Sequence, residues 1–349
     1  MPAEHVLVTG GLGFVGSAIL HALLNAHPSF KTTVLDIKPT PLGYKLPSGV
    51  NYIQADLRSK SDALRAIRGT KPTVIIHTAG YSPTGSARYS QTERAQVFSI
   101  NVKGTENILH AAREEGVKAF VYTSTCCVIS DDLDHDFPNM KETLPTGRAT
   151  TVYGQSKTIA EHLVLSVNYP ELATCALRPS VIFGPGDTQL IPTLHACIEK
   201  GETPFVVGDG FNLTDFTYVD NVSHAHVLAL ENLLGPKSAA GEAFFITNGQ
   251  PIPFRDFCLA VWTEFGHIPS YEIRIPKTLA WFAGSILDWV TWMTGKEVTL
   301  SAGSVKDAYG VRYASIEKAR KVLGYSPIVG LQEGIGISCK DYYERLNGK

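Results

Sequence analysis

Short apolar runs alternate with segments of helical periodicity through the first half of the sequence. The apolar runs lie at 5–10, 31–37, 72–80, 118–125 and 173–187, and the clearest helical patterns lie at 15–26, 60–69, 102–116 and 150–167. Strands that are apolar throughout, instead of alternating with polar residues, are typical of a parallel sheet with helices on both faces. The sequence therefore predicts an α/β fold with a Rossmann-type, doubly wound parallel sheet.

The pattern becomes more broken after residue 184, where the loops are rich in glycine and proline. We predict that residues 1–183 form a nucleotide-binding domain and that residues 184–349 form mainly a smaller C-terminal substrate-binding lobe. A later apolar run at 244–249 is expected to return to the main sheet. The chain has 349 residues, of which 44% are hydrophobic, and this is enough to build both parts.

The turn after the first apolar run carries glycines at the spacing G-x-x-G-x-x-G. Gly10 permits a tight turn, Gly13 lets the backbone approach a pyrophosphate, and Gly16 lets the helix pack on the strand. The backbone N–H groups of Phe14 and Val15 at the start of the helix are then free to bind phosphate oxygens. With a strand before it and a helix after it, this motif predicts a dinucleotide site.

Asp36 ends the second apolar run, twenty residues after Gly16. A carboxylate there accepts hydrogen bonds from the adenosine ribose and repels a 2′-phosphate, which favours NAD over NADP. Lys38 is close enough in sequence to soften this preference. Asp56, at another strand end, suits the adenine amino group. Within the first 125 residues, the other predicted cofactor contacts are Leu57, Thr78, Ala79, Gly80, Asn101 and Thr123.

Tyr153 and Lys157 are four residues apart at the start of a predicted helix, so their side chains share one face. They are either two surface residues or a catalytic pair. A tyrosine in water has a pKa of about 10, and a nearby ammonium group and the positive nicotinamide ring of a bound cofactor both favour the phenolate. Together with the glycine turn, the spacing predicts that Lys157 makes Tyr153 a general base and also binds the nicotinamide ribose.

A row of hydroxyl side chains ends the apolar run at 118–125. Polar groups at the carboxyl end of a parallel strand lie where ligands bind in open α/β sheets. We predict that Thr125 holds the alcohol oxygen of a substrate, with Ser124 as the second candidate for this role. No cluster of histidine, cysteine or acidic residues has the spacing of a metal site, so no metal is expected.

Four motifs make the chain similar to the extended short-chain dehydrogenase/reductases: TGGLGFVG, YTST, YGQSK and RPSVIFGPGD. Longer segments such as GDGFNLTDFTYVDNVSHAHVLAL resemble the 3β-hydroxysteroid dehydrogenase family, most of all its fungal branch of sterol-4α-carboxylate 3-dehydrogenases. The resemblance implies NAD-dependent oxidation of a sterol or terpenoid 3β-hydroxyl to the 3-ketone, followed by loss of a 4α-carboxyl as carbon dioxide. It also implies that Tyr153 is the base and that Pro179, Ser180, Val181 and Ile182 surround the nicotinamide.

Other functions stay open at this point. The same motifs occur in nucleotide-sugar epimerases and dehydratases and would suit a secondary-metabolite dehydrogenase acting on a 3-hydroxy-terpenoid. A regulator that binds the dinucleotide without turnover is disfavoured by the Tyr–Lys pair. A substrate carboxylate would favour a nearby cation, for which Arg88, Arg94 and Arg148 are candidates. The segment 129–149 is interpreted as a long loop, and residues 131–152, at the start of the helix with Tyr153, are expected to border the substrate pocket.

The segment 278–295 is unusually rich in tryptophan and other large apolar residues. It is interpreted as a helix that packs the small lobe, as a wall for a flat apolar substrate, or as a shallow membrane contact. A net charge of −2 gives no indication of nucleic-acid binding. We expect a cytoplasmic protein without a targeting segment, with peripheral contact to the endoplasmic reticulum membrane as an alternative. Helices of the first domain are expected to form a homodimer.

Overall fold

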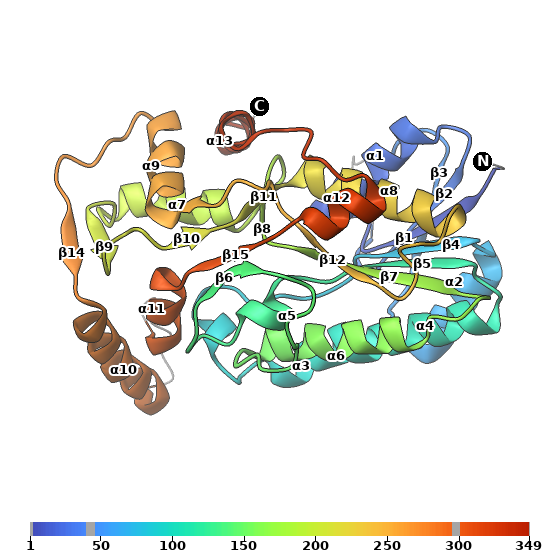
Figure 1. Cartoon of the computed structure of the whole chain (residues 1–349), viewed down its shortest axis with the longest axis horizontal. Helices are drawn as coiled ribbons and strands as arrows, with labels where there is room; N and C mark the ends of the chain where they lie inside the picture. The colour runs from blue at the N-terminus through green and yellow to red at the C-terminus, as the bar shows by residue number, and fades with distance from the viewer. Residues whose placement is uncertain (1–2, 40–45, 295–300, 349) are drawn as a thin grey trace.

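A seven-stranded, entirely parallel sheet forms the larger part of the molecule (Figure 1). The computed structural model describes residues 3–39, 46–294 and 301–348. The strand order is β3-β2-β1-β4-β5-β7-β12, built from β1 (His5–Thr9), β2 (Lys31–Asp36), β3 (Val50–Gln54), β4 (Val74–His77), β5 (Ala119–Thr123), β7 (Ala173–Pro179) and β12 (Ala243–Ile246). The predicted α/β, Rossmann-type fold is confirmed.

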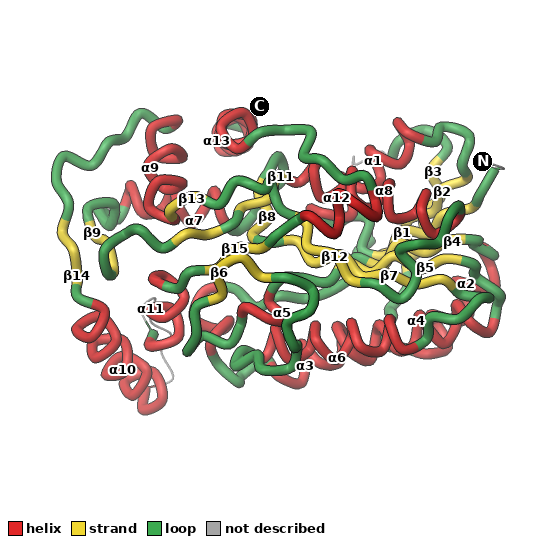
Figure 2. Tube along the Cα trace, viewed as in Figure 1, coloured by secondary structure: helices red, strands yellow, loops and turns green. Residues whose placement is uncertain are grey.

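Helices cover both faces of this sheet (Figure 2). One face packs against α1 (Phe14–Ala26), α8 (Val219–Leu234) and α12 (Glu317–Leu323), and the other against α2 (Lys60–Thr70), α4 (Gly104–Glu114) and α6 (Val152–Ser166). Successive residues of a strand point to opposite faces. Val6 and Val8 of β1 therefore enter the first core, whereas Leu7 enters the second.

The later part of the chain contributes to the nucleotide-binding layers as well as to a lobe of its own. β12 pairs with β7 at the edge of the main sheet, and α8 and α12 bury apolar side chains against it. The predicted division at residues 183 and 184 thus assigns to the second lobe several elements that complete the first core. The chain crosses between the two regions more than once.

The smaller lobe has an aromatic core of its own. It contains α7 (Leu190–Glu199), α9 (Phe254–Glu264) and α13 (Leu331–Leu346), together with the paired strands β8 (Val181–Phe183) and β11 (Phe216–Tyr218). The rings of Phe216 and Phe257 stack with their centroids 3.7 Å apart. Two further strands, β9 (Phe205–Val207) and β14 (Ile273–Ile275), pair in parallel at the periphery.

The segment 129–149, which the sequence predicts as a loop, contains regular structure that joins the two lobes. It follows the short helix α5 (Cys127–Ser130) and includes β6 (Phe137–Met140). β6 pairs with β15 (Arg312–Ala314), which also pairs with β10 (Leu213–Thr214), and β10 pairs with β13 (Ile252–Pro253). The strand partners of β6 lie far along the chain, so local sequence gave no indication of this sheet.

Two short helical turns between β4 and α4 are not α-helical, and a long helix lies at the edge of the smaller lobe. A π-helical turn, η2 (Ser99–Lys103), lies between α3 (Arg94–Phe98) and α4, and a 3₁₀ turn, η1 (Gly85–Tyr89), precedes them. The helix α10 (Lys277–Thr294) projects beside α11 (Ala302–Tyr309) at the edge of the molecule (Figure 1). Among the described residues, none of the helices is both long enough and apolar enough to traverse a bilayer.

Candidate active site

The first βα turn has the close backbone packing that its glycines predict. Gly10 has φ of +68°, and a Cβ there would lie 2.8 Å from the Ala79 backbone. A Cβ on Gly16 would lie 2.2 Å from the Gly10 carbonyl oxygen, so only glycine lets α1 approach the turn this closely. Gly13 is more open, with 3.2 Å from its Cβ position to the same oxygen.

Gly11 is a further restricted position in this turn, which the motif did not identify. A Cβ on Gly11 would lie 2.8 Å from Cγ1 of Val34 on the neighbouring strand β2. The only signal in the sequence was the doubled glycine that follows Thr9. Gly13 occupies the N-cap position of α1 and makes no side-chain cap, so the helix begins with unsatisfied N–H groups at Phe14 and Val15. This is the cradle that a pyrophosphate requires.

Asp36 lies at the end of β2, next to the glycine turn. Its carboxylate accepts hydrogen bonds from the backbone N–H groups of Leu12 and Lys38, each at 3.1 Å. Asp56 is different, because it forms an ion pair with Arg58 at 2.7 Å that lowers the pKa of Asp56. The following Leu57 is buried, and a Cβ on Gly104 of α4 would lie 3.6 Å from it.

The backbone at 78–80 is held by a buried chain of hydrogen bonds beneath it. Thr78 Oγ1 donates to the Thr9 carbonyl at 2.7 Å, and the Ala79 N–H donates to Thr9 Oγ1 at 3.3 Å. The same hydroxyl lies 2.7 Å from His77 Nδ1, while His77 Nε2 lies 3.0 Å from Thr105 Oγ1. Burial lowers the pKa of His77 to about 3, so this ring is neutral near pH 7.

Asn101 lies in the π-helical turn and connects this backbone with the catalytic helix. Its side-chain amide accepts from Tyr81 N–H at 2.7 Å and donates to Ser156 Oγ at 2.9 Å. Ser156 Oγ in turn donates to the Tyr153 carbonyl at 2.8 Å. A Cβ on Gly80 would lie 3.4 Å from Asn101 Oδ1, so Gly80 and Asn101 are close neighbours. The π-helical turn therefore places the Asn101 amide between the backbone near Gly80 and the helix that carries Tyr153.

The structure brings Tyr153 and Lys157 together with the end of β5. Both lie on α6, whose N-cap Thr151 accepts a hydrogen bond from the Gly154 N–H. Lys157 is buried, and its Nζ donates to the Thr123 carbonyl at 2.7 Å and lies 4.2 Å from the centroid of the Tyr122 ring. Burial lowers the pKa of Lys157 to about 7. The lysine is thus at the strand end where the hydroxyl side chains gather.

The sequence predicts that Lys157 and a bound nicotinamide ring together favour the Tyr153 phenolate, whereas the net effect of the protein's own surroundings is to raise the pKa of Tyr153. Burial is the largest effect and raises the pKa of the phenol, and Cys127 and Asp131 raise it further, whereas Arg88 lowers it. Desolvation disfavours the charged phenolate more strongly than its neighbours stabilise it. Conversion of Tyr153 to a base therefore requires additional positive charge, of the kind that an oxidised nicotinamide ring carries when bound.

The three hydroxyl side chains at the end of β5 have different partners. Thr123 Oγ1 lies 2.7 Å from His226 Nε2, and Ser124 Oγ donates to the buried Glu161 at 2.6 Å. Thr125 Oγ1 accepts from the Cys127 N–H at 3.2 Å and keeps its own proton to donate. Of the two candidates for the alcohol-binding role, Thr125 is therefore better suited than Ser124.

The segment 179–182 lies beside this strand end. The Pro179 carbonyl accepts from the Cys126 N–H at 2.9 Å, and Ser180 Oγ donates to the Asp215 carbonyl at 2.7 Å. Val181 and Ile182 begin β8, which pairs with β11 of the smaller lobe. Val181 is exposed. The segment thus runs from the main sheet into the second lobe next to Thr125, as a wall of the predicted nicotinamide site would.

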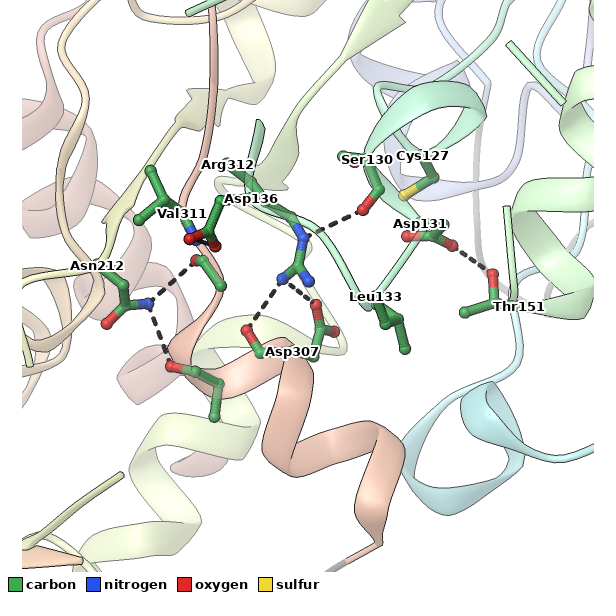
Figure 3. Close-up of polar contacts among 12 residues, drawn as sticks. Cys127, Ser130, Asp131, Leu133, Asp136, Thr151, Asn212, Asp307, Val311 and Arg312 are labelled. Atoms are coloured by element: carbon green, nitrogen blue, oxygen red, sulfur yellow. Dashed lines mark hydrogen bonds and ion pairs between the residues drawn. The ribbon is translucent and has the colours of Figure 1, made fainter. Parts of the chain in front are cut away.

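A cluster of acidic and basic side chains adjoins the start of the catalytic helix (Figure 3). Asp131 is buried, accepts a hydrogen bond from Thr151, and pairs with Arg88 at 2.8 Å. Asp307 of α11 pairs with Arg312 at 2.6 Å, and Arg312 Nε donates to the Ser130 carbonyl at 3.1 Å. Arg88 also lies 3.5 Å from Asp307, which connects the two pairs.

Of the three candidate cations, only Arg88 lies in this cluster. Arg94 hydrogen-bonds Gln155 at 2.8 Å, and Arg148 is exposed. Sequence reasoning missed Asp131, Asp307 and Arg312 altogether, because the segments that carry them are up to 181 residues apart and share no motif. Within the described part of the chain, no group of three or more histidine, cysteine or acidic residues has the arrangement of a metal site.

A glycine turn and a Tyr–Lys pair at the carboxyl end of a parallel sheet define a dinucleotide-binding oxidoreductase of the short-chain dehydrogenase/reductase type. Residues 7–277 match the model of the 3-beta hydroxysteroid dehydrogenase/isomerase family. The chain belongs to this family, and the resemblance noted from its motifs is confirmed.

Named relatives agree with this assignment, and a solved structure of an epimerase shares the fold. The sterol-4-alpha-carboxylate 3-dehydrogenase (decarboxylating) of Saccharomyces cerevisiae is 38% identical over 344 residues, which cover 95% of this chain and 96% of that protein. The enzyme of the same name from Mus musculus is 32% identical, over 99% of this chain and 93% of that protein. The NAD complex of Thermus thermophilus UDP-glucose 4-epimerase is 26% identical with a TM-score of 0.70, covering 97% of this chain and 99% of that one.

Proposed function

We propose that this protein oxidises the 3β-hydroxyl of a 4α-carboxylated sterol or terpenoid with NAD, and that the product loses its carboxyl as carbon dioxide. The observation that carries this proposal is the buried Lys157, one helical turn after Tyr153 and hydrogen-bonded to the Thr123 carbonyl at the end of β5. It stands in a chain that matches decarboxylating sterol-4-alpha-carboxylate 3-dehydrogenases over almost its full length. Tyr153, Lys157 and Thr125 act on the substrate alcohol, and Ser124 supports the strand end.

The dinucleotide-binding residues fit NAD in shape and charge. The glycine turn leaves room for a pyrophosphate beside Gly13, and the N–H groups of Phe14 and Val15 face it without a capping side chain. The Asp36 carboxylate would accept hydrogen bonds from the adenosine ribose and disfavour a 2′-phosphate. When bound, NAD accepts the hydride from the substrate carbon, and its positive ring favours the Tyr153 phenolate.

The reaction follows from what the side chains near Tyr153 do. Thr125 donates a hydrogen bond to the 3-hydroxyl oxygen, and Tyr153 removes the hydroxyl proton while the C3–H bond breaks and the carbonyl forms. Lys157 stabilises the phenolate that accepts this proton. The resulting 3-ketone lies β to the 4-carboxylate, so the C4–carboxyl bond breaks with its electron pair moving toward the ketone oxygen. Carbon dioxide leaves, and the enol takes a proton at C4.

The polar end of the substrate would lie near Arg88. Among the three arginines considered, Arg88 is the one that influences Tyr153, and it is partly buried between Asp131 and Asp307. C4, which carries the carboxylate, is bonded directly to the reacting C3, so the carboxylate needs a cation at this end of the pocket. We assign that role to Arg88, with Arg94 and Arg148 unsuited by their positions.

The helix α10 is proposed as a peripheral membrane contact. Its exposed apolar side chains are Leu279, Trp281, Phe282, Ile286 and Met293. The opposite face packs on α11, where a Cβ on Gly284 would lie 2.7 Å from the Ser301 carbonyl carbon. A sterol substrate partitions into bilayers, so an apolar face at the edge of the enzyme would bring the pocket to its substrate. The side chains of Trp289 and Trp292 lie outside the described residues. The homodimer expected from the helices of the first domain remains a prediction.

Substrate oxidation can be tested by NAD reduction across a panel of alcohols, with carbon dioxide release measured in parallel. The panel contains a 4α-carboxysterol, a plain 3β-hydroxysteroid, a 3-hydroxy-terpenoid and a nucleotide sugar. We expect both signals with the carboxysterol and NAD reduction alone with the plain steroid. Turnover of the nucleotide sugar alone would contradict the proposal and favour the epimerase or dehydratase alternative.

A further inference from the structure

A buried group of three polar side chains lies directly behind the Tyr153–Lys157 pair. Glu161, one turn after Lys157 on α6, has no exposed surface. Its Oε2 accepts from Ser124 Oγ at 2.6 Å and from Arg178 Nε at 2.9 Å, and its Oε1 accepts from Arg178 Nη2 at 2.6 Å. The carboxylate thus joins the catalytic helix to β5 and β7 at the same point.

Both partners of Glu161 immediately precede parts of the reaction site. Ser124 is followed by Thr125, which holds the substrate oxygen in the proposed function. Arg178 is followed by the segment 179–182 along the nicotinamide. Burying an ion pair is costly, and leaving one member without its partner costs more still. The Glu161–Arg178 pair nevertheless lies where its position affects both Thr125, through Ser124, and the segment 179–182, through Arg178.

We propose that Glu161 is a positioning residue for the reaction, whose carboxylate fixes the strand end that carries Thr125 and whose charge favours the ammonium form of Lys157. The inference rests on the roles that the proposed function gives to Tyr153, Lys157 and Thr125. Glu161 acts through Ser124 and Lys157 and has no role in contacting the substrate.

Glu161 is the anion that opposes the effect of burial on Lys157. Burial lowers the pKa of Lys157 to about 7, and Glu161 is the larger of the two groups that raise it. The other titratable groups around Lys157 are Tyr153 on α6, His77 on β4, Tyr122 on β5 and Cys127 on α5. These are neutral near pH 7, because burial lowers the pKa of His77 and raises that of the two phenols. A hydrogen bond with Cys126, and then burial, raises the pKa of the Cys127 thiol. Arg178 faces Glu161 from β7.

The charge on Glu161 decides which form of the catalytic pair exists after one proton is lost. The proton can leave Tyr153, which gives a phenolate beside an ammonium group, or it can leave Lys157, which gives a phenol beside an amine. Only the first form is a base for the substrate. Glu161 acts on Lys157 and is not among the main groups that act on Tyr153, so it favours the first form.

The test compares the pH dependence of kcat/KM in wild type and in Glu161→Gln. Removal of the negative charge makes Lys157 lose its proton more easily, so the acid limb should move to lower pH by roughly one unit. The active form becomes a smaller share of the singly deprotonated pair, so the plateau should fall by at least about tenfold. A purely structural role would lower the plateau and leave the acid limb at the wild-type pH.

Ser124→Ala is the matched control, because it removes the strand-end anchor and keeps the Glu161–Arg178 pair. We expect a lower kcat with the acid limb unchanged. Glu161→Gln leaves the Arg178 charge buried without a counter-charge and can fail to fold. The double variant Glu161→Gln/Arg178→Met removes both charges with little change in volume, and its acid limb should also move to lower pH.

A measurement that needs no turnover separates failure of this inference from failure of the proposed function. Titration of Lys157 is followed by NMR of lysine labelled with ¹³C at the ε carbon, assigned with Lys157→Met. The titration should move to lower pH in whichever charge variant folds. If Lys157 titrates at the wild-type pH in the folded charge variants, the proposal is overturned. If it moves while the wild type oxidises no alcohol, the inference about Lys157 stands and the proposed function is contradicted.

Discussion

The dinucleotide end and the reaction end of the site are built from different materials. The dinucleotide end consists of backbone, with Gly10 and Gly16 allowing contacts that no side chain permits. The reaction end consists of buried side chains, such as Lys157 and Glu161, whose charges depend on one another. A change at the first end should therefore act on shape and binding, and a change at the second on proton transfer.

Replacement of Tyr153 by Phe gives the largest expected effect and tests the reaction end directly. In the proposed function the phenol is the general base, so kcat should fall by roughly 10²–10⁴-fold while NADH affinity stays close to that of the wild type. Turnover is measured as NAD reduction, and affinity by quenching of protein fluorescence. Tyr169→Phe removes an exposed phenol and serves as the control. Near-normal turnover in Tyr153→Phe would show that another group is the base.

Gly16→Ala tests the dinucleotide end through shape alone. The added Cβ would lie 2.2 Å from the Gly10 carbonyl oxygen, so helix α1 must move. Overpacking of this kind costs about 1–3 kcal/mol in unfolding free energy, which urea denaturation measures. Gly13→Ala is the matched variant, since its Cβ would lie 3.2 Å from the same oxygen. It should fold almost normally but bind NADH weakly. Equal stability of the two variants would contradict this assignment of roles.

The sequence was informative about the dinucleotide end because its constraints are local. A glycine at a fixed spacing from a strand, or an aspartate at a strand end, is visible within 30 residues. The Tyr153–Lys157 pair was also visible, since both side chains belong to one helical turn. The fold class followed from periodicity, which depends on neighbours in sequence.

The rest of the site could not be predicted, because it depends on contacts between distant segments. Asp131 and Asp307 are 176 residues apart in sequence and are bridged by Arg88. The sequence also could not show that burial raises the pKa of Tyr153 more strongly than the neighbouring Arg88 lowers it. The choice between Ser124 and Thr125 likewise depended on where Glu161 lies.

The buried His77 predicts a pH dependence of stability at the dinucleotide end. Burial lowers its pKa to about 3, below the value of about 6.5 for an unfolded histidine. The stability that the neutral ring contributes is therefore complete above pH 6.5 and is lost progressively as the pH falls toward 3. Between pH 6.5 and 5 the loss is about 1.6 kcal/mol, measured by urea denaturation at both values.

His77→Gln is the variant that assigns this loss to His77. Glutamine is neutral throughout this range and has a donor and an acceptor for Thr9 and Thr105, the partners of the ring. We expect the unfolding free energy of His77→Gln to fall less between pH 6.5 and 5 than that of the wild type. His226, which burial also shifts downward, remains in both proteins and cancels in the comparison. If the unfolding free energy falls by the same amount in both proteins, His77 is protonated in the folded protein over this pH range.

Asp36→Ala gives the smallest expected effect and asks whether any part of the dinucleotide end acts through charge. The carboxylate is held by the N–H groups of Leu12 and Lys38, so its loss removes an acceptor for the adenosine ribose and a negative charge. We expect KM for NAD to rise about tenfold, which corresponds to about 1.4 kcal/mol. KM for NADP should fall, because the 2′-phosphate is no longer repelled and Lys38 is free to attract it. The ratio of kcat/KM for the two cofactors is the measurement. A ratio that stays at its wild-type value would mean that shape alone selects the dinucleotide. Charge would then act at the reaction end and not at the dinucleotide end.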